Sequence, residues 1–361
     1  MCIRDSFLGG ATFPGFHKLA RDYAQKRKLQ GTQEMNRLYV IESVTTTTGF
    51  KAEHRLAVKP SEVAAFAEAL AGAVGAGSAG GYSWTDHQAK YLQGVAADLK
   101  ASAGKCVVIP GEFATPEVHL AAFAINQALG NVGKTVVYTD PVNPMPSLQN
   151  ADLQSLVSDM NAGKVDWLVI LNSNPLYATP ADVDFESAFN KVGTVVHLGS
   201  HVDETGEIAH WHINNAHYLE MWSDARAYDG TVSIVQPMID PMYGGHNAHE
   251  IVQSLLDEPD VSAYDAVRGT WMANGGPLAK GDPEFNWRKA LHDGWIDGTA
   301  FAGKTVTAKA GAGAASAAGT SGAGGGDALE VASVSYTHLD VYKRQVLGRR
   351  RKVRAKPLRT P

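Results

Sequence analysis

The chain has few cysteines and no long apolar runs. Only Cys2 and Cys106 occur among its 361 residues. Two thiols cannot build a disulfide framework, a four-cysteine zinc site or an iron–sulfur site. No run of about 18 uncharged apolar residues occurs, so we expect no segment that spans a membrane. The composition, 44% hydrophobic and 19% charged, is instead that of a globular protein.

Basic residues are scarce outside one segment. Residues 343–361 contain nine lysines and arginines and no acidic residue. The rest of the chain has 23 basic against 37 acidic residues, a net charge of −14. Because nucleic-acid binding depends on cationic contacts to phosphates, we expect no nucleic-acid partner.

Both ends of the chain match a sequencing adapter. Val334–Gln345 is VSYTHLDVYKRQ, the translation of a reverse-complemented transposase mosaic end fused to a forward one, and Met1–Ser6 (MCIRDS) is the same adapter in another frame. We therefore interpret residues 1–6 as adapter, and residues 334–361 as adapter followed by a spurious basic tail. On this interpretation the natural N-terminus is missing, and the lack of a signal peptide carries no information.

The body of the chain alternates between short apolar runs and helical segments. The pattern predicts strands at 38–42, 54–58, 105–111, 135–140, 166–171 and 194–200, and helices at 16–29, 60–74, 87–102, 115–130, 151–163 and 185–192. This alternation predicts an α/β fold of Rossmann-like parallel sheets with flanking helices. We expect a partial first α/β domain at 7–100, a second Rossmann-like domain at 101–302, and a flexible Ala/Gly-rich linker at 303–333.

Two segments align without gaps at an offset of 157 residues. Leu38–Leu56 (LYVIESVTTTTGFKAEHRL) and Val195–Ile213 (VVHLGSHVDETGEIAHWHI) each contain an apolar strand, a polar loop, Thr-Gly-x-x-Ala and a second short strand. This repeat predicts two pseudo-repeated halves, with ligand-type loops at the carboxyl ends of strands. Two similar loops formed by ordinary turn chemistry remain the alternative.

Four segments, in this order, resemble motifs of the molybdopterin oxidoreductase superfamily. They are IESVTTTTGFKAEHRLAVKPSEVAAFAEALA, the turn Asn172-Ser173-Asn174-Pro175 after DWLVIL, DETGEIAHWHINNAHYLE, and ARAYDGTVSIVQP. The resemblance runs from about residue 16 to residue 298. It implies vestigial pterin-site positions at Glu42, Thr48, Asn172, Ser173, Asn174, Glu204 and Thr205.

Several segments resemble one branch of this superfamily more closely than the others. MNRLYVIES, HWHINNAHYLEMWSDARAYDGT and QPMIDPMYGG resemble the molybdopterin-like/iron–sulfur subunit of bacterial alternative complex III, a membrane-bound quinol oxidoreductase. This resemblance implies a non-catalytic first half that scaffolds an iron–sulfur domain absent from this fragment. It also implies partner subunits of a respiratory complex and the periplasmic face of the bacterial inner membrane.

Departures from the family's pattern argue against a bound molybdopterin dinucleotide. Ser61 takes the glycine position of a PGTD turn, where backbone would need to approach the nucleotide. Glu42-Ser43-Val44 replaces a DPR triplet and loses its cation. We therefore expect no cofactor in this fragment, although Glu42 could still accept a hydrogen bond from a ribose hydroxyl.

Two other functions stay open. The first is a catalytic molybdopterin-dependent oxidoreductase, which the superfamily resemblance alone would imply. The second is a His-ligated metal hydrolase, with His210 and His212 as candidate metal ligands because they lie two residues apart on a predicted strand. Asp203, Glu204 and Glu207 are near in sequence, but the pattern provides no recognisable third ligand.

Overall fold

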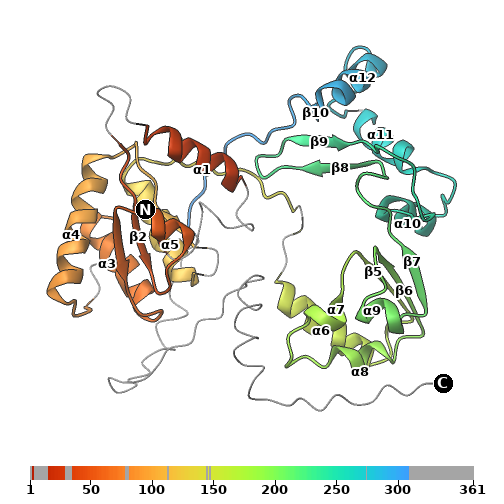
Figure 1. Ribbon diagram of the computed structural model, residues 1–361, viewed down its shortest axis with the longest axis horizontal. Coiled ribbons are helices and arrows are strands. Elements are labelled where there is room, and N and C mark those ends of the chain that lie inside the picture. The colour runs from red at the N-terminus through yellow and green to blue at the C-terminus, as the bar shows by residue number, and fades with distance from the viewer. Residues whose placement is uncertain are drawn as a thin grey trace. The chain divides into compact units, whose positions relative to one another are not determined.

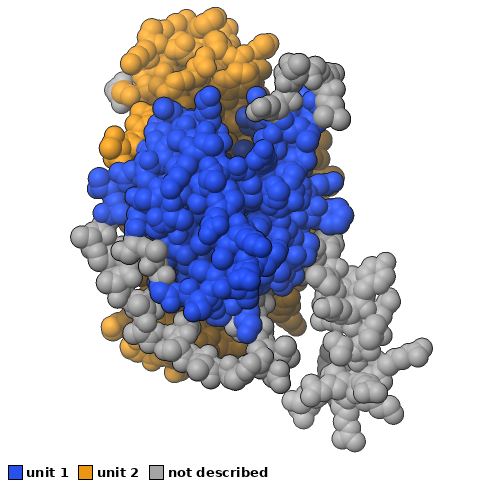
Figure 2. All heavy atoms as spheres, turned by 90° about the vertical axis from the view of Figure 1, so that its left-hand side faces the viewer, with its two compact units in different colours: residues 1–136, 307–361 blue, residues 137–306 orange. Residues whose placement is uncertain are grey.

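The computed structural model describes residues 2–3, 15–28, 35–77, 81–111, 114–143, 145, 148–273 and 275–308. The predicted tail at 334–361 lies outside these residues, as does the predicted linker beyond residue 308. The chain divides into two compact units, shown in Figure 2. Unit 1 comprises residues 1–136 and 307–361, and unit 2 comprises residues 137–306.

Unit 1 contains a four-stranded sheet in which every neighbouring pair is parallel (Figure 1). Its order is β3 (His54–Ala57), β2 (Tyr39–Glu42), β1 (Cys2–Ile3) and β4 (Ile109–Pro110). Strand β1 belongs to the segment that we interpret as adapter. Strand pairing uses backbone groups that all residues share, so this pairing does not bear on the segment's origin.

Helices pack on both faces of this sheet. Unit 1 contains α1 (Phe16–Gln25), α2 (Thr47–Lys51), α3 (Glu62–Val74), α4 (Asp86–Ala101) and α5 (Pro116–Ala128). The main core joins α3, α4 and α5 to Ile41 and Leu56 on one face. Tyr23 of α1 packs against Val40, which points to the other face because side chains alternate along a strand.

The helix ends follow ordinary capping chemistry. Thr85 begins α4 with a capping box, in which its hydroxyl accepts from the Gln88 amide and Gln88 accepts from the Thr85 amide. Gly75 ends α3 with a φ of 86°, in the left-handed region that favours glycine.

Unit 2 contains a three-stranded parallel sheet in the order β5 (Trp167–Leu171), β6 (Thr194–Gly199) and β7 (Trp211–Asn214). The helices around it are α6 (Gln149–Asn161), α7 (Pro175–Ala178), α8 (Phe185–Phe189) and α9 (Glu204–Ile208). Met160, Phe185 and Phe189 are buried against Ile170 and Val195, so α6 and α8 cover one face of the sheet.

A second sheet in unit 2 is antiparallel, in the order β10 (Trp295–Ile296), β9 (Val232–Val235) and β8 (Ser223–Arg226). Helices α10 (Ala248–Leu255), α11 (Ala263–Met272) and α12 (Pro283–Asp293) follow β9 in the chain. The buried Trp287 of α12 packs against Val232 and Ile296. The sequence analysis predicted no strands for this antiparallel sheet.

The predicted α/β class, with parallel sheets and flanking helices, is confirmed. The predicted strand at 135–140 is wrong, because Val136 and Tyr138 form only isolated bridges. The amides of Thr135 and Val136 bond the carbonyl of Asn131, which holds this segment in a turn. The first unit extends to residue 136 rather than 100, because α5 packs in the same core as α3.

Membrane-spanning helices were not expected, and among the described helices none combines the length and hydropathy that crossing a bilayer requires.

Phe66 provides a test of the unit 1 core. It is fully buried, and its ring makes edge contacts with Trp84 and Tyr91 at centroid distances of 5.5 and 6.2 Å. We predict that Phe66→Ala lowers the free energy of unfolding of unit 1 by about 3–5 kcal/mol, because it leaves a cavity. Phe50→Ala is the matched control, since Phe50 is 77% exposed. Hydrogen-exchange mass spectrometry of α3 and α4 measures both, and equal losses would contradict the assigned core.

Candidate functional site

The two aligned segments form the same strand–helix–strand unit. In unit 1, β2 is followed by the five-residue helix α2 and the parallel strand β3. In unit 2, β6 is followed by α9 and β7 with the same connection. The bounds of α9 and β7 equal those of α2 and β3 shifted by 157 residues. The repeat inferred from the sequence is therefore a structural repeat, with one copy on each of two separate sheets.

Each loop is closed by the same local hydrogen bond. Thr46 and Asp203 occupy equivalent N-cap positions, and their side-chain oxygens accept from the amides of Gly49 at 3.1 Å and Gly206 at 2.8 Å. This cap satisfies a helix amide that lacks a partner within so short a helix.

The glycine of each loop lies directly above a pair of polar side chains. A Cβ atom on Gly49 would lie 1.9 Å from Oε1 of Glu42, and one on Gly206 would lie 2.8 Å from Nδ1 of His212. Real Cβ atoms do not approach other atoms so closely. The shared glycine is therefore required by what packs beneath the loop.

In the first loop the polar pair is Glu42 and Arg55. Glu42 is fully buried, and its Oε1 accepts from Nε of Arg55 at 2.5 Å. Its Oε2 accepts from the Thr46 amide at 3.1 Å and from the Thr46 hydroxyl at 2.8 Å. The carboxylate that could have accepted from a ribose hydroxyl thus bonds Thr46 of its own loop and Arg55 of β3. Thr48, the other site residue expected here, is also fully buried.

The cation missing from the expected triplet is supplied by Arg55, which the sequence analysis did not identify. Arg55 lies opposite Val40 in the register of β2 and β3, so it shares a face with both Val40 and Glu42. Side chains alternate between the two faces of a strand, and this alternation was the sequence signal that could have identified Arg55.

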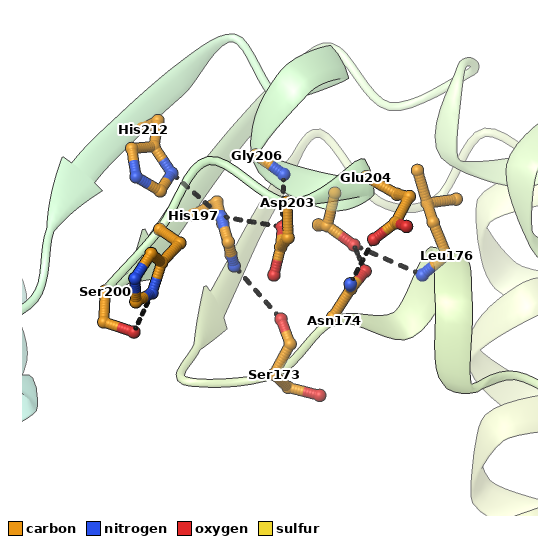
Figure 3. A network of polar contacts seen from close by, with 11 residues as sticks. Ser173, Asn174, Leu176, His197, Ser200, Asp203, Glu204, Gly206 and His212 are labelled. Atoms are coloured by element: carbon orange, nitrogen blue, oxygen red, sulfur yellow. Dashed lines mark hydrogen bonds and ion pairs between the residues drawn. The ribbon is translucent and has the colours of Figure 1, made fainter. Parts of the chain in front are cut away.

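In the second loop, the structure brings together the five site residues expected in unit 2. Asn174 donates from Nδ2 to Oε2 of Glu204 at 2.6 Å, and its Oδ1 accepts from the Thr205 hydroxyl at 2.8 Å. Thr205 in turn accepts from the Leu176 amide at 3.2 Å. Figure 3 shows this network at the carboxyl ends of β5 and β6. It joins the turn after β5 to the start of α9.

Asn172 and Ser173 shape the turn itself. Asn172 has a φ of 52°, in the left-handed region that asparagine tolerates better than most residues. The carbonyl of Ser173 lies 3.1 Å from Nε2 of His197, so the turn also contacts the polar pair below the loop.

That polar pair consists of His197 and His212, which lie opposite each other in the register of β6 and β7. Their Nδ1 atoms are 3.0 Å apart, and Asp203 lies 3.9 Å from Nδ1 of His197 (Figure 3). A carbonyl only accepts, so Nε2 of neutral His197 carries the proton that bonds Ser173. Nδ1 of His197 then accepts from the Nδ1–H of His212. Burial, reinforced by the neighbouring His197, lowers the pKa of His212.

The candidate metal ligands His210 and His212 have different partners. His210 precedes β7, and its Nδ1 accepts from the Val195 amide at 3.0 Å. His212 faces His197 instead. Among the described residues, no three His, Cys, Asp or Glu side chains gather in a way that could hold a metal ion.

Comparison with known proteins gives likenesses among solved structures. Among solved structures, the chain is similar to acetylene hydratase from Pelobacter acetylenicus, with a TM-score of 0.49 and 10% sequence identity. The match covers 75% of this chain and 48% of that protein, so this chain spans about half of its length. No protein-family model matches the chain, and no curated protein matches it.

The buried ion pair of the first loop gives a prediction. Arg55→Ala should reduce the stability of the β2–β3 region by about 3–5 kcal/mol, because it leaves the Glu42 carboxylate buried without a cation. Arg37→Ala is the control, since Arg37 is exposed and solvent screens its pair with Asp98, so the loss of stability should be much smaller. Hydrogen exchange of residues 38–58 distinguishes the two, and a small effect from both would show that the pair is not needed.

The histidine pair predicts a pH dependence. Because the pKa of His212 lies below its unfolded value of 6.5, the unfolded chain binds more protons just below that pH. The stability contribution is therefore fully present above about pH 6.5 and is lost as the pH falls through the folded pKa. Unfolding of unit 2 in urea should require less denaturant at pH 5.5 than at pH 7.5.

Two substitutions isolate this effect. His212→Gln should reduce the pH dependence between 7.5 and 5.5, because the titrating group is gone. His201→Gln should leave it unchanged, since His201 is exposed and bonds only the adjacent Ser200 hydroxyl in the described contacts. An unchanged slope in the His212 variant would exclude the pair as its source.

Proposed function

We propose that this chain is the non-catalytic, molybdopterin-oxidoreductase-like part of a subunit of a respiratory quinol oxidoreductase. In this role it scaffolds an iron–sulfur electron-transfer domain of the same subunit and contacts other subunits of the complex at the periplasmic face of the bacterial inner membrane. The sequence motifs described above support this assignment, since four of them occur in the order typical of the superfamily. The parallel α/β fold agrees with it.

The observation that carries the proposal is the closure of the first loop by its own side chains. The Glu42 carboxylate is fully buried and accepts from Arg55 and Thr46. A carboxylate in this state has no free face for a ligand hydroxyl, and the guanidinium beside it is already paired. The loop keeps the shape of a ligand-binding loop, but its polar groups stabilise the loop itself.

The second loop does not fit a dinucleotide either. A pyrophosphate requires cations or free backbone amides. Residues 199–208 (GSHVDETGEI) contain three acids and no lysine or arginine, and residues 171–178 contain no charged residue. The amides of Gly206 and Glu207 already bond Asp203. An anionic cofactor would therefore face like charges and occupied donors, so we derive no cofactor chemistry from this loop.

Elemental analysis tests this proposal and both alternatives together. The full chain is expressed in a host that synthesises the molybdenum cofactor and is purified under mild conditions, alongside a known molybdopterin enzyme as a positive control. We expect molybdenum far below one atom per chain. Near-stoichiometric molybdenum would favour the catalytic oxidoreductase. Stoichiometric zinc or iron that His212→Ala abolishes would favour the metal hydrolase.

A further inference from the structure

Two loops of unit 2 form an exposed apolar surface, here called the 218–243 face. It consists of Tyr218, Leu219, Met238, Ile239, Met242 and Tyr243, which are between 40% and 79% exposed. The amides of Met238 and Ile239 both donate to the carbonyl of Leu219, at 2.7 and 3.2 Å, which holds the two loops side by side. Exposed apolar side chains that gather in this way mark interaction surfaces, and methionine adapts to varied partners.

A hollow of about 330 Å³ adjoins this face. Ile239 belongs to both, and the wall includes Trp222 and Tyr264, whose rings meet edge to face at 4.9 Å. A cavity of this size is at the lower end of those that hold a small ligand or a long side chain. An aromatic wall is suited to a cation, because the face of an aromatic ring is negative.

The charge of the hollow has one sign. Glu220, Asp240 and Glu250 line it, and no lysine or arginine does. In the described contacts Glu220 accepts from the His217 amide, and Glu250 accepts from the Asn247 amide and lies beside His246. Neither contact brings a lysine or arginine, so both carboxylates lack a permanent cation.

A second hollow beside the first also has acidic lining residues. It has a volume of about 440 Å³, shares Glu250 and Ser262 with the first, and adds Asp260. Its lining likewise contains no lysine or arginine. The two adjoining hollows are thus lined by four carboxylates, with no lysine or arginine among the lining residues.

We propose that the 218–243 face binds an apolar, basic segment of a partner protein, with a lysine or arginine entering the hollow whose wall includes Trp222 and Tyr264. The apolar side chains supply contact area, and the carboxylates select the sign of charge. A second copy of this face would oppose like charges, and so would an anionic lipid surface. The proposal rests on the proposed function only for the existence of a partner subunit, since the surface itself is observed.

Fluorescence anisotropy with two labelled model peptides tests this proposal. One is an amphipathic leucine–lysine peptide, and the other has glutamate at every lysine position. We expect the full chain to bind the lysine peptide at least about tenfold more tightly than the glutamate peptide, with affinity falling as salt rises. The measurement is repeated on a chain ending at Ser333, because the nine basic residues of the tail would compete in cis. A preference for the lysine peptide in either chain supports the proposal.

Matched variants separate this face from general charge attraction. The Glu220→Gln/Asp240→Asn double variant and Met238→Ser should each weaken binding of the lysine peptide at least about fivefold. Asp182→Asn/Glu186→Gln and Met145→Ser are the controls, since all three residues are exposed elsewhere in unit 2. Circular dichroism confirms that each variant is folded.

Three outcomes would overturn the proposal: equal binding of both peptides, equal losses in the face and control variants, or binding of phosphatidylglycerol vesicles that Met238→Ser abolishes. None of these outcomes affects the molybdenum content, so failure here is distinguishable from failure of the proposed function.

Discussion

The close approach of a loop glycine to a polar pair, one member of which is fully buried, is the constraint on which both strand-end loops depend. Gly49 lies above Glu42, and Gly206 lies above His212, at distances that leave no room for a side chain. A buried polar group is costly unless it is hydrogen-bonded. Each pair must therefore find its partners in the strands and loop around it, and this requirement fixes the path of the loop.

The register of the parallel strands determines which residues can form such a pair. Val40 and Arg55 are opposite in unit 1, and His197 and His212 are opposite in unit 2. In unit 1 the second polar group is Glu42, two residues beyond Val40 on the same face. In unit 2 the equivalent position is Gly199, and the ring of His197 lies against it, since a Cβ there would be 2.7 Å from its Cε1. The space that the Glu42 side chain fills in unit 1 is therefore filled in unit 2 by the ring of His197, two residues before Gly199.

Local patterns predicted much of this fold. The apolar runs at 38–42 and 194–200 became β2 and β6, and Thr115 lies at the N-cap position of α5 as its sequence context indicates. The ungapped alignment identified the repeat, but the short helices α2 and α9 lie in segments that were expected to be polar loops. The strand predicted at 135–140 does not form, because its apolar residues have no core to pack into and Val137 is 60% exposed. Strand β10 pairs with β9 across about 60 residues of chain, and no local pattern contains that pairing.

The sequence likewise predicted some residues of the candidate site and missed others. Residues of the second loop were predicted because they follow strands directly, and the turn at Asn172 carries its own backbone signal. Arg55 was missed because its role depends on register, and His197 was not among the candidate site residues. A charge pair across neighbouring strands has no fixed sequence spacing, so the sequence shows its members but not their contact.

The same strand–helix–strand backbone packs over two chemically different pairs of side chains, and this difference is relevant to the function of the loops. Glu42 and Arg55 form an ion pair, whereas His197 and His212 are joined by a hydrogen bond between their ring nitrogens. A site selected for one ligand would be expected to keep one chemistry beneath its loop. Retaining the backbone while exchanging an ion pair for a hydrogen-bonded pair of imidazoles agrees with the proposed scaffold role, because the fold requires only that the space be filled and the polar atoms be paired. The 218–243 face lies in other segments of unit 2. The proposal that it binds a basic partner segment is therefore independent of the two strand-end loops.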